Sequence, residues 1–270
     1  MEMKQVQKPI KRSKLRRKLG KEFYCLKERA RWILGEEHWS NELSSERLPF
    51  IVKEHRSLLL RKLKDVDMYL QHNKITNLQL AIERMDGIII KPGQSFSLWK
   101  LVGRPTKARG FLEGMTLTNG QVTKGIGGGL CQLGNLIYWM AIHSPLTITK
   151  RWRHSYDVFP DVNRKIPFGS GATLSYNYID LQIKNTTDTT YQINLWLNNT
   201  HLNGNICAAL SPNFSYTIQE RDHRFVQQWW GGYTRHNEIW RLVTNTLTGE
   251  ISEELITENH AIMMYNPLIE

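Results

Sequence analysis

The apolar residues of this 270-residue chain change their spacing partway along, and this change limits the folds available to it. In the first part of the chain the clearest patterns, within Leu15–Ile33 and Leu133–Met140, have apolar residues three and four apart, which is the period of a helix face. From about Ile166 apolar and polar residues alternate instead, as in Tyr191–Leu197, which is typical of half-buried strands. The sequence therefore predicts an α+β fold with N-terminal helices, a glycine-loop and helix core, and a strand-rich C-terminal half.

Residues 1–35 form a basic amphipathic arm. Lys and Arg fill the positions between apolar residues that lie three or four apart, namely Leu15, Leu19, Phe23, Leu26, Ala30 and Ile33. This pattern predicts a helix with one apolar face. The face is expected either to pack on the body, to lie on an anionic membrane, or to meet another partner.

The charge of the chain is concentrated in this arm. The first 35 residues hold twelve Lys and Arg against three acids, a net +9, whereas the other 235 hold 24 against 22, a net +2. A nearly neutral body does not favour nucleic acid as a partner.

Two further helices and two strands are expected before residue 100. One helix is predicted over about Leu48–Leu70. The next is predicted from about Asn73, with Thr76 or Asn77 as its cap. Gly87 should end it, and buried strands are expected at Ile88–Ile90 and Ser95–Trp99.

Several classes of protein do not fit. No secretory signal and no bilayer-spanning apolar run are visible, so we expect a cytoplasmic protein, peripheral to the inner face of the membrane through its arm. The three cysteines (Cys25, Cys131 and Cys207) form no CxxC pair, so no structural metal site is expected. The glycines match neither a phosphate loop nor a dinucleotide fingerprint, so no cofactor is expected.

The most informative stretch is Gly125–Met140, where glycines at Gly127, Gly128 and Gly129 precede an apolar helix pattern. It places Cys131 in the first turn of that helix, where unpaired N–H groups and the helix dipole favour a thiolate. Glycine N–H groups could also stabilise an oxyanion. The alternative is a tight turn with Cys131 as a small buried residue.

A second group of candidates follows the β-branched run Thr147–Thr149. His154 is a candidate general base for Cys131, with Asp157, Asp161 or Asp180 orienting its ring. A histidine that merely forms structural hydrogen bonds is the alternative.

The order of short motifs resembles the VanW family over roughly Asn77–Leu197. The resemblance is carried by Pro92–Ser97, Gly110-Phe111, Asn119-Gly120, Gly127–Gln132, Arg153-His154, Ala172-Thr173 and Asp180-Leu181. It implies a link to the bacterial cell wall and to vancomycin resistance, but no reaction. Many family members have Asp-Ala-Thr where this chain has Gly171-Ala172-Thr173, so a role of that aspartate would be lost or moved here, with Asp180 the nearest carboxylate.

Two hypotheses follow for the function. In the first, the protein is a hydrolase or transferase acting on peptidoglycan or its precursors, with Cys131, His154 and Asp180 catalytic. In the second, it is a non-catalytic module that binds a precursor or docks to a membrane-bound resistance enzyme. Either way, ligand contacts are expected from Gly127–Gly129, Gln132 and Arg153, and in the second also from Trp99, Trp139 and Trp152.

The chain is expected to divide into four parts. These are the arm (1–35), a helical lead-in (36–75), a VanW-like domain (76–200) and a β-rich C-terminal extension (201–270).

Overall fold

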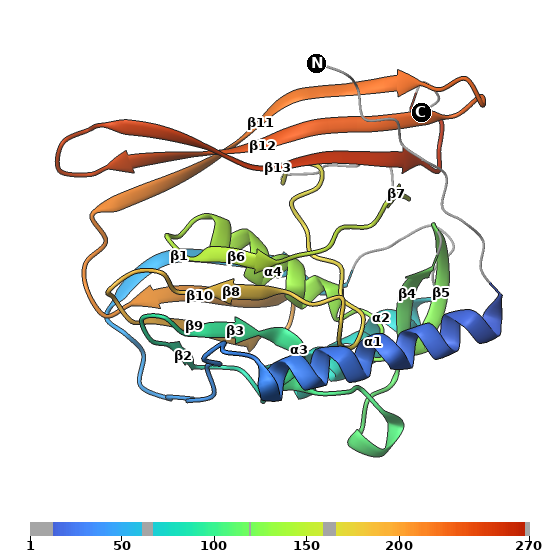
Figure 1. Cartoon of the computed structure of the whole chain (residues 1–270), viewed down its shortest axis with the longest axis horizontal. Helices are drawn as coiled ribbons and strands as arrows, with labels where there is room; N and C mark the ends of the chain where they lie inside the picture. Colours follow the sequence, from blue (N-terminus) through green and yellow to red (C-terminus); the bar gives the residue numbers. More distant parts are fainter. Residues whose placement is uncertain (1–12, 61–66, 119, 159–165, 268–270) are drawn as a thin grey trace.

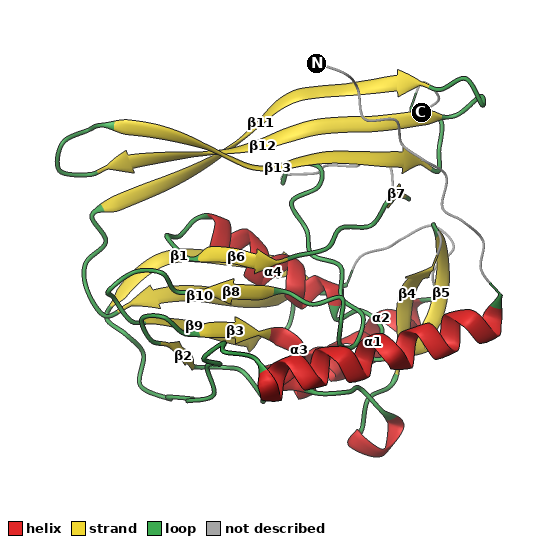
Figure 2. Cartoon of the chain, viewed as in Figure 1, coloured by secondary structure: helices red, strands yellow, loops and turns green. Residues whose placement is uncertain are grey.

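The computed structural model describes residues 13–60, 67–118, 120–158 and 166–267. It confirms the α+β class: helices are interspersed with strands in the first half, and long strands make up the end of the chain (Figures 1 and 2). The α-helices are α1 (Lys14–Leu34), α2 (Met68–Ile82), α3 (Leu98–Val102) and α4 (Cys131–Ile142), with one 3-10 helix at Lys107–Arg109.

The strands form four groups. One sheet has the order β1-β10-β9-β2, a second β3-β8-β6, a third β11-β12-β13-β7, and β4 pairs with β5 as a hairpin. The bounds are β1 (Phe50–Leu58), β2 (Ile88–Ile90), β3 (Ser95–Ser97), β4 (Glu113–Thr118), β5 (Gln121–Ile126), β6 (Thr147–Lys150), β7 (Tyr156–Asp157), β8 (Gln182–Lys184), β9 (Tyr191–Leu197), β10 (His201–Ala208), β11 (Phe214–Gln227), β12 (Tyr233–Asn245) and β13 (Ile251–Met263).

The hydrophobic core lies where the helices meet the first sheet. Helix α4 packs against β1, β10 and β6, and α2 packs against β4 and β9. Most of α4 is buried, including Leu133, Leu136, Ile137 and Met140 at the helical spacing expected for this segment. This apolar face holds the glycine turn that precedes α4 in a fixed position.

The three long strands β11, β12 and β13 form a separate layer, drawn at the top of Figure 1, while α1 crosses the lower part of the molecule. Their antiparallel pairing is continuous apart from two irregularities, at Arg221/Arg224 and Ile239/Trp240. The segment that follows β6 reaches this layer, because β7 pairs in parallel with β13.

The helix expected over Leu48–Leu70 is wrong. Residues 50–58 form β1 instead, which pairs with β10 at the edge of the first sheet. Pairing with a distant strand overrides a local pattern that also suits a helix. Residues 61–66 of this prediction lie outside the described part of the chain.

Two other boundaries differ from expectation. Helix α2 begins at Met68 after Asp67, so Thr76 and Asn77 lie inside it and cap nothing. The strand expected over Ser95–Trp99 ends at Ser97, whose hydroxyl caps the short helix α3 by accepting a hydrogen bond from the Lys100 N–H.

Helix α1 forms as the periodicity predicts, but its apolar face does not pack on the body. Leu19 and Phe23 are 63% and 61% exposed, while Cys25 and Glu28, on the other side of the helix, are buried. The expectation that the apolar face joins the core is therefore wrong.

Candidate functional site

The glycine turn leads directly from β5 into α4, as the sequence predicts. Gly127 and Gly129 adopt positive φ values of 74° and 92°, which side chains rarely tolerate. Cys131 is the first residue of α4. The local geometry of the candidate site is thus a tight turn followed by a helix N-terminus.

The protein's own atoms fill the space beside the three glycines. A Cβ on Gly128 would lie closer than 3.0 Å to the backbone of Gly114, and one on Gly129 equally close to the side chain of Lys74. A Cβ on Gly127 would lie 2.6 Å from Pro105 Cβ. These glycines permit close packing of the chain on itself.

Two of the three glycine N–H groups already have internal partners. Gly127 N donates to Leu112 O at 3.0 Å, and Gly128 N donates to Gly125 O at 3.0 Å. They stabilise the turn and are not directed at a ligand in this structure.

Asn77 holds this turn in place, a role that the sequence pattern did not reveal. Its Oδ1 accepts from Leu112 N at 2.8 Å, while its Nδ2 donates to Leu112 O at 3.1 Å and to Gly128 O at 2.9 Å. Asn77 is fully buried. A polar residue on the buried face of α2 is the signal that could have indicated such an anchor.

Cys131 is half-buried, and burial raises the pKa of its thiol. The sulfur lies 3.9 Å from Leu174 O, a weak hydrogen bond to a backbone carbonyl. The expected lowering by the helix N-terminus does not outweigh the loss of hydration. At neutral pH the structure therefore favours the neutral thiol.

His154 is the expected base for this thiol. Burial, and then the charge of Arg153, lower the pKa of its ring. Within the described residues no hydrogen bond joins His154 to Cys131, Asp157 or Asp180, and Asp161 lies outside that part of the chain. The structure does not assemble these residues into a hydrogen-bonded triad.

Gln132 and Arg153, the other two expected ligand-binding side chains, contact the protein itself. Gln132 Nε2 donates to Ser57 Oγ at 2.9 Å and to Leu58 O at 2.8 Å, which ties α4 to β1. Arg153 donates to His260 O and lies over the Phe168 ring at 5.2 Å. Both side chains link elements of the fold.

The three tryptophans expected to grip a glycan lie in different surroundings. Trp99 is buried and Trp139 is half-buried, whereas Trp152 is 51% exposed. The carbonyl of Trp152 accepts from Thr173 N at 2.8 Å, so the backbone of this residue lies beside the segment whose Leu174 carbonyl contacts Cys131.

Asp180 is fully buried at the start of α3, away from any hydrogen bond to His154. Its carboxylate accepts hydrogen bonds from Ser97 Oγ at 2.6 Å, Trp99 N at 3.1 Å and Gln182 Nε2 at 3.1 Å. Burial raises its pKa to about 6. This carboxylate anchors a helix start.

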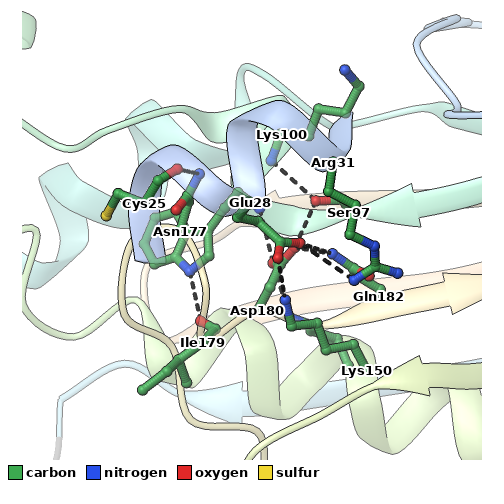
Figure 3. A network of polar contacts seen from close by, with 12 residues as sticks. Cys25, Glu28, Arg31, Ser97, Lys100, Lys150, Asn177, Ile179, Asp180 and Gln182 are labelled. Atoms are coloured by element: carbon green, nitrogen blue, oxygen red, sulfur yellow. Dashed lines mark hydrogen bonds and ion pairs between the residues drawn. The ribbon is translucent and has the colours of Figure 1, made fainter. Parts of the chain in front are cut away.

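Figure 3 shows that Asp180 belongs to a larger buried network. Gln182 Nε2 also donates to Glu28 of α1 at 3.0 Å, and Lys150 of β6 forms an ion pair with Glu28 at 2.8 Å. Two carboxylates from distant parts of the chain thus share Gln182, with Lys150 beside them. Among the described residues no group of three or more His, Cys, Asp or Glu could hold a metal ion.

Comparison with known proteins identifies the family. A family model described as VanW like protein matches residues 73–207. A curated relative, the vancomycin B-type resistance protein VanW of Enterococcus faecalis, is 35% identical over 233 residues, which is 86% of this chain and 84% of the relative. The chain belongs to the VanW family. An uncharacterized protein of Bacillus subtilis, YoaR, is 27% identical over 109 residues, 40% of this chain and 34% of that protein. No solved structure matches.

The VanW match contains Cys131, His154 and Asp180 but neither α1 nor β11–β13. Glu28, which joins Asp180 through Gln182, therefore comes from outside the matched residues. The buried network connects the VanW-like part to the arm.

The segment Gly171-Ala172-Thr173, for which the resemblance implies Asp-Ala-Thr in other members, lies against the start of α4. Asn135 Oδ1 accepts from Ala172 N at 2.7 Å, and a Cβ on Gly171 would lie 2.7 Å from the same oxygen. An aspartate at Gly171 would therefore require Asn135 to move. In this chain the amide of Asn135 occupies the space that such a side chain would enter.

The raised pKa of Asp180 predicts a pH-dependent stability. In the folded protein the carboxyl group of Asp180 stays protonated up to about pH 6, whereas its ordinary pKa is 3.8. The bound proton therefore stabilises the folded state fully below the ordinary pKa, and this stabilisation is lost as the pH rises through about 6. In urea unfolding, the free energy of unfolding of the wild type should fall by about 2 kcal/mol relative to that of Asp180→Asn between about pH 4 and pH 7. If the difference in free energy of unfolding between wild type and variant were the same at every pH, the prediction would be contradicted, because such a difference would come only from altered hydrogen bonds.

Proposed function

We propose that this protein is a non-catalytic accessory module of cell-wall metabolism linked to vancomycin resistance, which binds a peptidoglycan precursor without cleaving it. The supporting context is its membership of the VanW family and its relationship to a vancomycin resistance protein. The observation that carries the proposal is that the glycine–cysteine segment is packed and hydrogen-bonded against the protein's own chain.

Three requirements of a cysteine hydrolase or transferase are poorly met by this segment. Such an enzyme needs a thiolate, whereas burial raises the pKa of Cys131. It needs a base within hydrogen-bond reach, and His154 makes no hydrogen bond to the thiol among the described residues. It needs free N–H groups for an oxyanion, and two of the three glycine N–H groups, those of Gly127 and Gly128, already donate to backbone carbonyls of the protein.

The exposed ring of Trp152 is the proposed contact for the ligand. The backbone of Trp152 is hydrogen-bonded to Thr173, the residue before Leu174, whose carbonyl Cys131 contacts. An exposed indole next to polar backbone is suited to stacking on the apolar face of a sugar ring.

We place the protein at the inner face of the cytoplasmic membrane, where a lipid-linked precursor would be its ligand.

The full chain should be tested with a lipid-linked disaccharide-peptide precursor in detergent micelles, with binding and product followed separately. We expect saturable binding that Cys131→Ala retains and Trp152→Ala weakens, with no product formed. Trp229→Ala is the matched control, since Trp229 is 92% exposed on the separate C-terminal layer.

Two results would overturn the proposal. One is a product, or a covalent adduct on the protein, that disappears with Cys131→Ala. This would support the enzyme hypothesis, which is favoured by the position of Cys131 in the first turn of α4. The other is an absence of saturable binding.

The thiol itself gives a direct prediction. Because burial raises its pKa, Cys131 should react with iodoacetamide at neutral pH at least about tenfold more slowly than a free thiol. His154→Ala should leave that rate unchanged. Peptide mass spectrometry would separate Cys131 from Cys25 and Cys207, and labelling in denaturant gives the reference rate. Faster labelling than a free thiol would contradict the prediction.

A further inference from the structure

We propose that α1 is an interfacial helix that docks the protein on an anionic lipid surface through its outward apolar face. This inference goes beyond the proposed function and does not depend on what Cys131 does. It rests on the orientation of α1, on what fixes that orientation, and on the charge around the apolar face.

The outward face of α1 is apolar along the whole helix. Its large side chains are mostly exposed: Leu15 67%, Leu19 63%, Phe23 61%, Leu26 63%, Ile33 79% and Leu34 83%. A helix on a globular protein normally turns such a stripe toward the core. Here a contiguous apolar stripe faces outward, which marks an interaction surface.

Polar contacts on the opposite side fix this orientation. Glu28 pairs with Lys150 at 2.8 Å and accepts from Gln182, and the carbonyl of Cys25 accepts from Asn177 Nδ2 at 3.3 Å (Figure 3). Nearer the start of the helix, Glu22 forms an ion pair with Arg104 at 2.6 Å. Turning the apolar face inward would break the buried pair, so the stripe stays available to a partner.

The charge on α1 selects the partner. The helix carries eight Lys and Arg and two acids; both acids, Glu22 and Glu28, pair with cations of the body, and Glu28 also lies 3.7 Å from Arg31 of α1. The exposed side of α1 therefore combines apolar side chains with a large excess of cations over acids. Apolar residues that enter the interface, flanked by cations that meet anionic headgroups, are the pattern of an interfacial helix.

A second copy of the chain suits this face less well. Two such helices packed face to face would bring two strongly basic surfaces together, and like charges oppose that contact.

No helix in the described part of the chain is long and apolar enough to cross a membrane.

The test uses the full chain with two kinds of vesicle, pure phosphatidylcholine and phosphatidylcholine with about one third phosphatidylglycerol. We expect co-sedimentation with the anionic vesicles, weakened by high salt, and much less with the neutral ones. The double variant Leu19→Gln/Phe23→Gln should lower the partition coefficient at least about tenfold. The control is Leu210→Gln/Leu247→Gln, which removes exposed apolar side chains outside α1 and should bind like wild type.

A second variant separates charge from apolar insertion. Arg16 and Lys27 lie on the same exposed side of α1. The variant Arg16→Glu/Lys27→Glu should reduce binding to anionic vesicles at least about tenfold without changing the thermal unfolding midpoint. The proposal is overturned if wild type does not bind anionic vesicles, or binds no better than Leu19→Gln/Phe23→Gln. It is also overturned if sedimentation shows a dimer of the wild type that Leu19→Gln/Phe23→Gln abolishes, since a second copy of the chain would then cover the apolar face of α1.

Discussion

Replacing Gly128 with alanine is expected to lower the free energy of unfolding by about 3 kcal/mol. An added Cβ would lie closer than 3.0 Å to the backbone of Gly114, and backbone cannot move aside as a flexible side chain can. The same shift would strain the hydrogen bond from Asn77 Nδ2 to Gly128 O. Chemical denaturation followed by tryptophan fluorescence would measure the change.

Gly93→Ala is the matched control. Gly93 has a φ of 77°, but nothing lies within 4 Å of the Cβ that alanine would add. It should therefore cost only about 1 kcal/mol, from backbone strain alone. If Gly128→Ala were as stable as wild type, the close packing of the turn on Gly114 would be wrong. If the two variants lost equal stability, steric contact would not be the cause.

Local signals in the sequence predicted the turn and helix well. Glycines followed by apolar residues at helical spacing describe α4 without reference to any distant residue, and β9 was equally clear because its alternation is complete within seven residues. Local patterns of this kind specify an element, but not which face meets which neighbour.

The errors arose where distant contacts decide the structure. Residues 50–58 became a strand because β10 offers an edge to pair with. Asn77 looked like a helix cap, but it lies inside α2, where its partners are Leu112 and Gly128. The orientation of α1 depends on Glu28 meeting Lys150 and Gln182, which lie more than a hundred residues away. No local pattern carries such information.

The candidate site was predicted in composition but not in arrangement. The sequence identified Cys131 as the first residue of a helix, but nothing in it showed that the Gly127 and Gly128 N–H groups have internal partners. From the sequence, Asp180 is a candidate as the carboxylate nearest to Gly171. Its burial with Ser97 and Gln182 comes from the meeting of β3 and β8.

Replacing Lys150 with methionine is expected to destabilise the protein by about 3 kcal/mol, because the change removes the nearer, buried cation of Glu28 and leaves its carboxylate only the half-exposed Arg31, at 3.7 Å. The side chains of Lys150 and Glu28 are only 16% and 8% exposed, so water cannot replace the lost partner. Asp180 lies next to Glu28 through Gln182, which adds the repulsion of a second carboxylate. Denaturant unfolding gives the size of the loss.

The double variant Glu28→Gln/Lys150→Met decides whether an unpaired charge is the cause. The double variant has no buried carboxylate at position 28 that lacks its cation, so it should be more stable than Lys150→Met alone. Lys91→Met is the surface control, since Lys91 pairs with Glu42 where both side chains are about half exposed, and it should change stability little. If Lys150→Met behaved like Lys91→Met, the buried network would not be what holds α1. The outward orientation of its apolar face would then need another cause.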